Sequence, residues 1–175
     1  MTDGRIDLTR HVRDIPDFPK EGILFRDIMP LLQDPVALRE AVDRIIEYGT
    51  GKHVDVVLGA EARGFILGAA VAYGLGAGFV CARKPGKLPF TTISAEYDLE
   101  YGTDQLEVHA DAILPGQNVL VHDDLLATGG TAKAKIDLVE QLGGKVVGCA
   151  FLIELTALKG RKKIEGYDIF SLIQY

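Results

Sequence analysis

The stretch that decides the fold reads VLVHDDLLATGGTAKA and spans residues 119–134. It opens with a β-branched, apolar run at 119–121, typical of a buried strand, and residues 133–142 carry apolar side chains at helical spacing. Two adjacent acids and a Thr-Gly-Gly-Thr turn lie between them, so a strand end leads directly into a helix start. This order predicts a phosphate-binding corner in an α/β protein.

The glycine turn has the features of an anion site. We expect Gly129 and Gly130 to reach positive φ and let the backbone approach a ligand, while the free N–H groups of the new helix attract an anion. Thr128 and Thr131 add hydroxyl donors. Because no Lys or Arg lies between residues 123 and 131, a bound phosphate would depend on backbone N–H groups, hydroxyls and the helix dipole.

The acids at Asp123 and Asp124 point to the rest of the ligand. Two carboxylates beside a phosphate repel it unless they serve another group, for which a ribose diol or a ligand-borne Mg²⁺ would be suitable. An ordinary strand-turn-helix corner would use the same glycines but would leave both acids unexplained. The stretch therefore predicts a phosphorylated sugar, and it lacks the Gly-Lys-Ser/Thr ending of a P-loop.

A second loop, GAEARG at residues 59–64, also follows an apolar run and precedes a helix. Its Arg63 offers a planar fork of donors suited to phosphate or pyrophosphate, and Lys84 or Lys87 of the basic loop 83–87 could close over the same ligand. The ordinary alternative for Arg63 is a surface arginine. Two such loops on one sheet, with acids between them, predict a ligand that carries phosphate at both ends.

The remaining pattern predicts the architecture. Apolar strands at 54–58, 79–82, 119–121 and 146–153 alternate with helices, which indicates a mostly parallel, twisted α/β sheet with helices on both faces. Asp34 and Pro35 should begin a helix over 36–48. Strict alternation over 93–101, resumed at 106 and 108, predicts a β-hairpin with one wet face that could act as a flap.

Composition limits the function. The length of 175 residues fits a single domain, and a net charge of −6 without a long basic stretch argues against nucleic acid or an anionic membrane as the main partner. Two cysteines, Cys81 and Cys149, without a secretory signal predict buried, reduced thiols and a cytoplasmic protein.

The uncharged segment 64–82 is nearly long enough to span a bilayer. Closely spaced glycines interrupt it, so we expect a buried helix plus a strand, not a membrane span. Gly64 and Gly68 have the spacing of a close helix-packing face, which predicts tight packing on a sheet or on a partner subunit.

Five segments together resemble a known family. They are DFPKEGILFRDI at 17–28, GAEARGF at 59–65, RKPGKLP at 83–89, LEYGTDQLE at 99–107 and the stretch at 119–134. The chain resembles the type I phosphoribosyltransferases over nearly its whole length; the last segment is typical of the whole family and the others of its adenine branch. The resemblance implies the type I phosphoribosyltransferase fold, with an N-terminal hood that supplies a base-binding segment, 1–33, and a flexible flap, 83–110.

The resemblance also implies an activity and a set of partners. The enzyme would transfer a phosphoribosyl group from PRPP to N9 of adenine in purine salvage, giving AMP and pyrophosphate. Mg²⁺ would be bound mainly through PRPP, with no direct metal ligand from the protein, and the enzyme would be a homodimer.

Each matching residue receives a role from the resemblance. The residues that would hold the 5′-phosphate are Ala127, Thr128, Gly129, Gly130 and Thr131. Those that would hold pyrophosphate are Glu61, Ala62, Arg63, Lys84 and Lys87. Those that would bind adenine are Leu24, Phe25, Arg26 and Leu125. The catalytic set would be Arg63 at the leaving group, Asp123 and Asp124 at the ribose, and Glu100 near N7 of the base.

Several alternatives stay open at this point. Phe25 also fits plain core packing, and Glu100 also fits a solvated strand carboxylate. We interpret His122 as a packed or hydrogen-bonded histidine because it alternates away from Asp123 on the strand. Another purine base is an alternative to adenine, and a PRPP-sensing regulator of the same fold is a further one, although the chain has neither spare length nor a basic helix for DNA binding.

Overall fold

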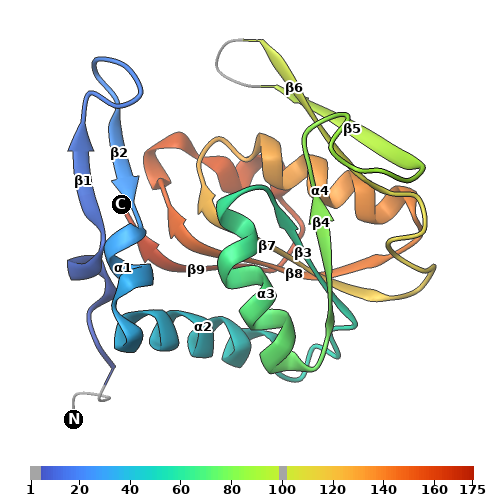
Figure 1. Ribbon diagram of the computed structural model, residues 1–175, viewed down its shortest axis with the longest axis horizontal. Coiled ribbons are helices and arrows are strands. Elements are labelled where there is room, and N and C mark those ends of the chain that lie inside the picture. The colour runs from blue at the N-terminus through green and yellow to red at the C-terminus, as the bar shows by residue number, and fades with distance from the viewer. Residues whose placement is uncertain (1–4, 99–101) are drawn as a thin grey trace. The chain divides into compact units, whose positions relative to one another are not determined.

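The computed structural model describes residues 5–98 and 102–175 (Figure 1). The chain forms two units, Met1–Arg44 and Ile45–Tyr175. The first contains the 3-10 helix η1 (Leu8–His11), the antiparallel strands β1 (Arg13–Pro16) and β2 (Leu24–Asp27), the helix α1 (Met29–Gln33) and the first part of α2 (Pro35–Gly49). Asp34 caps α2, because its Oδ1 accepts hydrogen bonds from the backbone N–H groups of Val36 (2.8 Å) and Ala37 (3.0 Å). The predicted start of this helix is therefore confirmed.

The second unit contains a five-stranded sheet in which every pairing is parallel. The strand order is β4 (Gly78–Ala82), β3 (Val56–Ala60), β7 (Asn118–Leu126), β8 (Lys145–Glu154) and β9 (Ile169–Gln174). The prediction of a parallel sheet is confirmed. Strand β9 was not predicted, because its sequence IFSLIQ includes two polar residues and it is only partly buried at the edge of the sheet.

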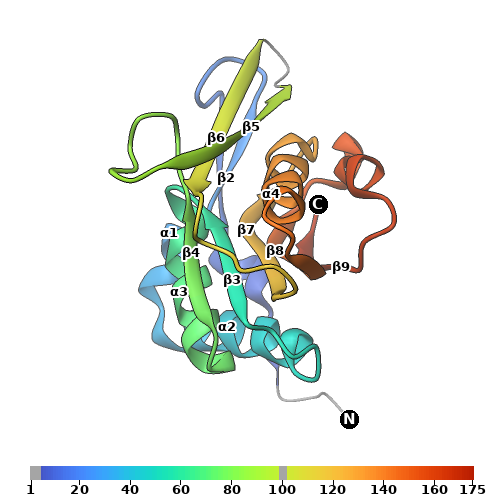
Figure 2. The same ribbon diagram turned by 90° about the vertical axis from the view of Figure 1, so that its right-hand side faces the viewer.

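The chain leaves the middle of this sheet in two directions. From β3 it passes through α3 (Arg63–Leu75) to β4, whereas from β7 it passes through α4 (Gly130–Gln141) to β8 on the other side. Right-handed crossovers that run in opposite directions place their helices on opposite faces, and α3 and α4 do lie on opposite faces of the sheet (Figure 2). The carboxyl ends of β3 and β7 thus form a topological switch point, where ligands of open α/β sheets bind.

A β-hairpin of β5 (Thr92–Asp98) and β6 (Thr103–His109) projects from the unit (Figure 1). Ala95, Leu106 and Val108 are buried while Ser94 and Glu96 are exposed, so the predicted hairpin with one wet face is confirmed. Residues 99–101 of the predicted alternation lie outside the described residues. Two short 3-10 helices, η2 (Thr156–Leu158) and η3 (Gly160–Ile164), connect β8 to the last strand.

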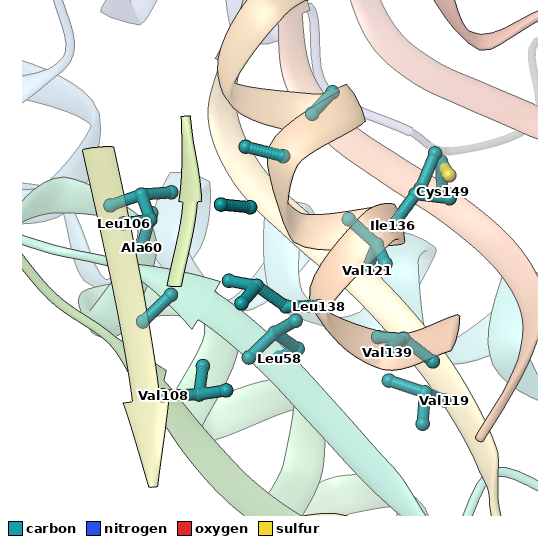
Figure 3. Close-up of a cluster of buried hydrophobic side chains, with 14 of the residues drawn as sticks. Leu58, Ala60, Leu106, Val108, Val119, Val121, Ile136, Leu138, Val139 and Cys149 are labelled. Atoms are coloured by element: carbon teal, nitrogen blue, oxygen red, sulfur yellow. The ribbon is translucent and has the colours of Figure 1, made fainter. Parts of the chain in front are cut away.

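The core of the second unit lies between α4, the central strands and the hairpin (Figure 3). Leu58 of β3, Val121 of β7, Ile136 of α4 and Val108 of β6 meet there, each fully buried. Their shared burial shows that α4 and the hairpin cover one apolar face of the central strands.

The uncharged segment 64–82 is divided between α3 and β4, as predicted. Among the described residues, none of the helices has both the length and the apolar character needed to cross a bilayer. The thiol of Cys149 is buried, whereas Cys81 is only half-buried, because the edge strand β4 pairs with β3 alone.

A large-to-small substitution on β8 tests this core. Phe151 has no exposed surface, so Phe151→Ala should lower the free energy of unfolding by about 3–5 kcal/mol through lost burial and a residual cavity. Thermal denaturation followed by circular dichroism would measure the change. The matched control, Phe90→Ala, truncates a ring that is 60% exposed and should shift Tm little. An equal shift for both variants would contradict this core.

Candidate active site

A cavity of about 250 Å³ lies at the switch point between β3 and β7. It is lined by the loop after β3, the end of β7, the first turn of α4, and side chains from the hairpin and the segment before it. These residues are Ala60, Glu61, Ala62, Arg63, Lys84, Tyr97, Leu106, Asp123, Asp124, Leu125, Leu126, Ala127, Thr128, Gly129, Gly130, Thr131 and Ala132. The two predicted anion loops and the two acids between them therefore meet in one cavity.

The acid pair lies within β7, not after it. Pairing of β7 with β3 stops at His122, whereas pairing with β8 continues to Leu126. The predicted strand end at Val121 is wrong for this reason: the chain beyond it keeps one neighbour and loses the other. Asp123 and Asp124 consequently stand where the sheet opens, on a backbone that β8 holds extended.

The phosphate loop begins α4 as predicted, but its two glycines differ. Gly129 has a φ of 85° and caps the helix, whereas Gly130 is the first helical residue and has no positive φ. The expectation of positive φ at both is therefore wrong for Gly130, whose backbone already follows the helix. A Cβ at Gly129 would lie 2.5 Å from the carbonyl oxygen of Gly160, so only glycine permits this approach of η3.

The two carboxylates have different partners. Arg63 lies at the start of α3, and its Nε is 3.0 Å from Oδ2 of Asp124. Lys135 of α4 lies 2.7 Å from Oδ2 of Asp123, whose Oδ1 accepts a hydrogen bond from the backbone N–H of Asp124 at 3.0 Å. Both acids are buried. Each pairs with a cation from a different helix, and the two helices lie on opposite faces of the sheet.

Burial changes the proton affinity of this cluster. Burial and the neighbouring charge of Asp123 raise the pKa of Asp124 to about 7, against the opposing effect of Arg63. Burial lowers the pKa of His122 to about 4, so its ring is neutral at pH 7. The Nδ1 of His122 lies 2.9 Å from the carbonyl oxygen of Ala150, which agrees with its interpretation as a hydrogen-bonded core histidine.

The residues expected at the pyrophosphate already form ion pairs. Glu61 accepts from the guanidinium of Arg83 (3.1 Å) and the ammonium of Lys87 (3.4 Å). Burial acts to raise the pKa of Glu61, but the Lys84 N–H and these cations outweigh it and keep the pKa below its usual value. The ammonium of Lys84 contacts the carboxylate of Asp104 and, at 3.0 Å, the hydroxyl of Tyr97. Lys87 does not line the cavity, because its side chain turns to Glu61.

The residues expected at the base are divided between the units. Leu125 lines the cavity of the second unit. Leu24, Phe25 and Arg26 lie on β2 of the first unit, where the Phe25 ring packs edge-on against Phe18 with centroids 5.1 Å apart. Glu100 lies outside the described residues.

Sequence reasoning missed Lys135. Its side chain has no exposed surface, and its Nζ contacts the backbone carbonyl of His122 as well as Asp123, both at 2.7 Å. One signal was present: Lys135 stands three residues after Ala132 and four before Val139, on the apolar face of the predicted helix. A lysine at a buried helical position needs a buried acid.

Comparison with known proteins identifies the family. Residues 32–174 match the phosphoribosyl transferase domain. The chain belongs to the phosphoribosyltransferase family. It is 61% identical to the adenine phosphoribosyltransferase of Thermotoga sp. (strain RQ2) over 97% of this chain and 100% of the relative.

Solved structures agree with this membership. Adenine phosphoribosyltransferase from Thermoanaerobacter pseudethanolicus is 55% identical, with a TM-score of 0.94 over 96% of this phosphoribosyltransferase and 98% of that chain. The Saccharomyces cerevisiae enzyme, complexed with D-2,5-dideoxy-2,5-imino-altritol 1,6-bisphosphate and adenine, is 40% identical, with a TM-score of 0.89 over 94% and 96% of the two chains. The type I phosphoribosyltransferase fold predicted from the sequence is thus confirmed.

The raised pKa of Asp124 predicts a pH-dependent effect on stability. Because the folded state binds this proton more tightly than the unfolded chain, the stabilisation is complete below pH 3.8 and is lost as the pH rises through about 7. Asp124→Asn keeps a neutral group at every pH. The difference in Tm between this variant and the wild type should therefore be more favourable to the variant at pH 8 than at pH 5, by about 3 °C or more.

Differential scanning fluorimetry at the two pH values would measure this difference. Asp137→Asn is the matched control, because Asp137 pairs with Lys133 on the surface of α4. It should shift Tm equally at both pH values. The same equal shift in Asp124→Asn would disprove the buried, proton-binding state of Asp124.

Proposed function

We propose that this phosphoribosyltransferase converts adenine and PRPP to AMP and pyrophosphate in purine salvage. The observation that carries the proposal is the placement of two anion loops on either side of a buried carboxylate pair at one switch point. PRPP has the matching shape, with a 5′-phosphate, a ribose and a diphosphate in that order. A bisphosphate and adenine, the ligands of the yeast neighbour, present the same two anionic ends and the same base.

The 5′-phosphate would lie on the loop of residues 127–131. The first turn of α4 points N–H groups toward this loop, since its first internal helical bond is that from the Lys133 N–H to the Gly129 carbonyl. The hydroxyls of Thr128 and Thr131 line the same cavity. These neutral donors would bind the 5′-phosphate without a Lys or Arg side chain. The basic residues would then remain available for the diphosphate end of PRPP.

Pyrophosphate would be held by the loop at Glu61, Ala62 and Arg63 together with Lys84 and Lys87. Arg63 and Lys84 already line the cavity. Each of the three cations has a carboxylate partner in the structure, so binding would exchange that carboxylate for a phosphate oxygen. Glu61 would act by orienting Lys87 and the Lys84 backbone, which it contacts at 3.4 Å and 2.5 Å.

Adenine would be bound by Leu24, Phe25, Arg26 and Leu125, roles that come from the family resemblance. Apolar and aromatic side chains suit the faces of a purine, and backbone groups suit its polar edge. On the same basis the chain would work as a single domain, in which residues 1–33 supply the base-binding segment and residues 83–110 act as a flexible flap. Tyr97 and Leu106 of the hairpin line the cavity, which supports a flap above the site.

The chemistry follows from charge. When the bond between C1 and the diphosphate oxygen breaks, its electron pair leaves with pyrophosphate and the sugar becomes oxocarbenium-like. Asp123 and Asp124 would stabilise that positive charge, while Arg63 would stabilise the departing anion. The N9 lone pair of adenine, with the ring proton on N7, then bonds to C1, and Glu100 would take up that proton from N7.

Mg²⁺ would enter the site with PRPP. No group of three or more His, Cys, Asp or Glu side chains in the part of the chain that the structure describes is arranged to hold a metal ion. Mg²⁺ commonly binds through substrate phosphates with few protein ligands, and PRPP offers such oxygens. When bound, the ion would neutralise charge on the leaving diphosphate.

Two further properties are proposed with the function. The enzyme would be a homodimer, for which the exposed apolar side chains of Ile66 (45%) and Tyr73 (90%) on α3 offer a surface. The free thiols of Cys81 and Cys149 fit a reducing compartment such as the cytoplasm.

A base-selection assay tests the proposed function. The protein would be incubated with PRPP, Mg²⁺ and, separately, adenine, hypoxanthine, guanine or xanthine, and nucleotide formation followed by chromatography. We expect AMP to form at least about 100-fold faster than any other nucleotide, because a site built to hydrogen-bond one base rejects others strongly. Faster formation of another nucleotide would assign a different purine, and no turnover with any base would favour a PRPP sensor.

The flap glutamate can be tested separately. Glu100→Gln keeps the shape but removes the proton acceptor, so kcat should fall about 100-fold or more while KM for PRPP changes little. Steady-state kinetics would measure both constants. Glu96→Gln, an exposed acid of the same hairpin, is the matched control and should leave kcat unchanged. A kcat near that of the wild type in Glu100→Gln would rule out proton transfer by Glu100.

A further inference from the structure

Lys135 is a fully buried lysine beneath the carboxylate pair. Its ammonium lies 2.7 Å from Oδ2 of Asp123 and 2.7 Å from the carbonyl oxygen of His122. A buried ammonium without solvent must keep its partners, because the cost of removing it from water is offset only by close opposite charge. Lys135 is therefore a fixed cation of the site.

The second cation, Arg63, is placed differently. Its side chain is 31% exposed and reaches Asp124 from the rim of the cavity. It is also the residue proposed to hold the diphosphate, so it would serve Asp124 before PRPP binds and the diphosphate afterwards. Arg63 is thus the movable cation of the pair.

The local charge follows from these two positions. With both ion pairs formed, two carboxylates face two cations and the cluster is neutral, because the buried ring of His122 is uncharged. Once Arg63 turns to the diphosphate, its charge no longer opposes proton uptake by Asp124, and Lys135 remains as a cation that does. Without Lys135 the same step would leave two adjacent buried carboxylates with no cation, and one of them would take up a proton.

We propose that Lys135 is a positioning residue that holds Asp123 inward and keeps a larger share of Asp124 as the carboxylate facing the ribose when Arg63 moves to the diphosphate. The catalytic consequence rests on the proposed function. The effect of the Lys135 charge on Asp124 is independent of that function. Since Lys135 acts to lower the pKa of Asp124, its loss should raise that pKa further above 7.

The charged and titratable groups around the pair come from all the elements packed against it. They are Arg63 from α3, Lys135 from α4, His122 on β7 itself, Cys149 on β8, and Glu61 and Lys84 at the cavity rim. Burial lowers the pKa of His122 to about 4 and raises the pKa of Cys149 to about 12. Neither of these two titrates near pH 7, so among these protein groups it is Asp124 whose pKa lies there.

Lys135→Met tests the proposal, because methionine fills much of the same space without the charge. We expect kcat with adenine to fall about 10-fold or more at pH 7.5, and the acid limb of its pH profile to move up by about one unit or more. Lys133→Met, the same change two residues away in a partly exposed pair with Asp137, should keep the wild-type profile. A lysine with only a structural role would lower Tm and leave the acid limb in place, which would overturn the proposal.

A second comparison covers the case in which Lys135→Met does not fold. Asp123→Asn leaves Lys135 as an uncompensated cation, whereas Asp123→Asn with Lys135→Met removes both members of the buried pair. The pKa of Asp124, read from its carboxyl carbon by NMR, should be about one unit or more higher in the double variant than in Asp123→Asn. Equal values would overturn the proposal. This measurement needs no turnover, so it gives its answer even if the base assay disproves the proposed function.

Discussion

The burial of two adjacent carboxylates on the central strand is the constraint on which the rest of this structure depends. Asp123 and Asp124 lie where β7 has lost β3 and kept β8, so little solvent and an incomplete set of strand neighbours surround them. Two like charges this close stay ionised only if cations meet them. The doubly wound sheet supplies one from each helical layer, through Arg63 of α3 and Lys135 of α4.

The same constraint explains the small residues around the site. A Cβ at Gly64 would lie 2.7 Å from Oδ1 of Asp123, so α3 approaches the acids only because its second residue has no side chain. Gly68, one turn later, meets Phe79 and the ring of His122 in the same way, at 2.8 Å and 3.2 Å. The predicted close-packing face of residues 64 and 68 therefore serves the sheet and the acid pair at once.

Features with a local signal could be predicted from the sequence, whereas features that depend on distant segments could not. The cap at Asp34, the hairpin and the glycine corner carry their signals within a few residues, and the structure has each of them. The length of β7 could not be read from its letters, because Asp123 and Asp124 are poor strand residues that β8 holds extended. Lys135 was missed because its reason for burial, Asp123, lies 12 residues away on another element.

The pairing of the cations also bears on which anion the site selects. Arg63 pairs with Asp124, Lys84 with Asp104 and Lys87 with Glu61, so each of these carboxylates has a cation before an anion binds. An anion with one phosphate replaces one of these contacts at most and gains little over the carboxylate that it displaces. A diphosphate bound as proposed would contact more than one of these cations, and its second contact would form within the same bound molecule once the first had formed. The acids that neutralise the cations would thus favour a leaving group with two phosphates over a single phosphate.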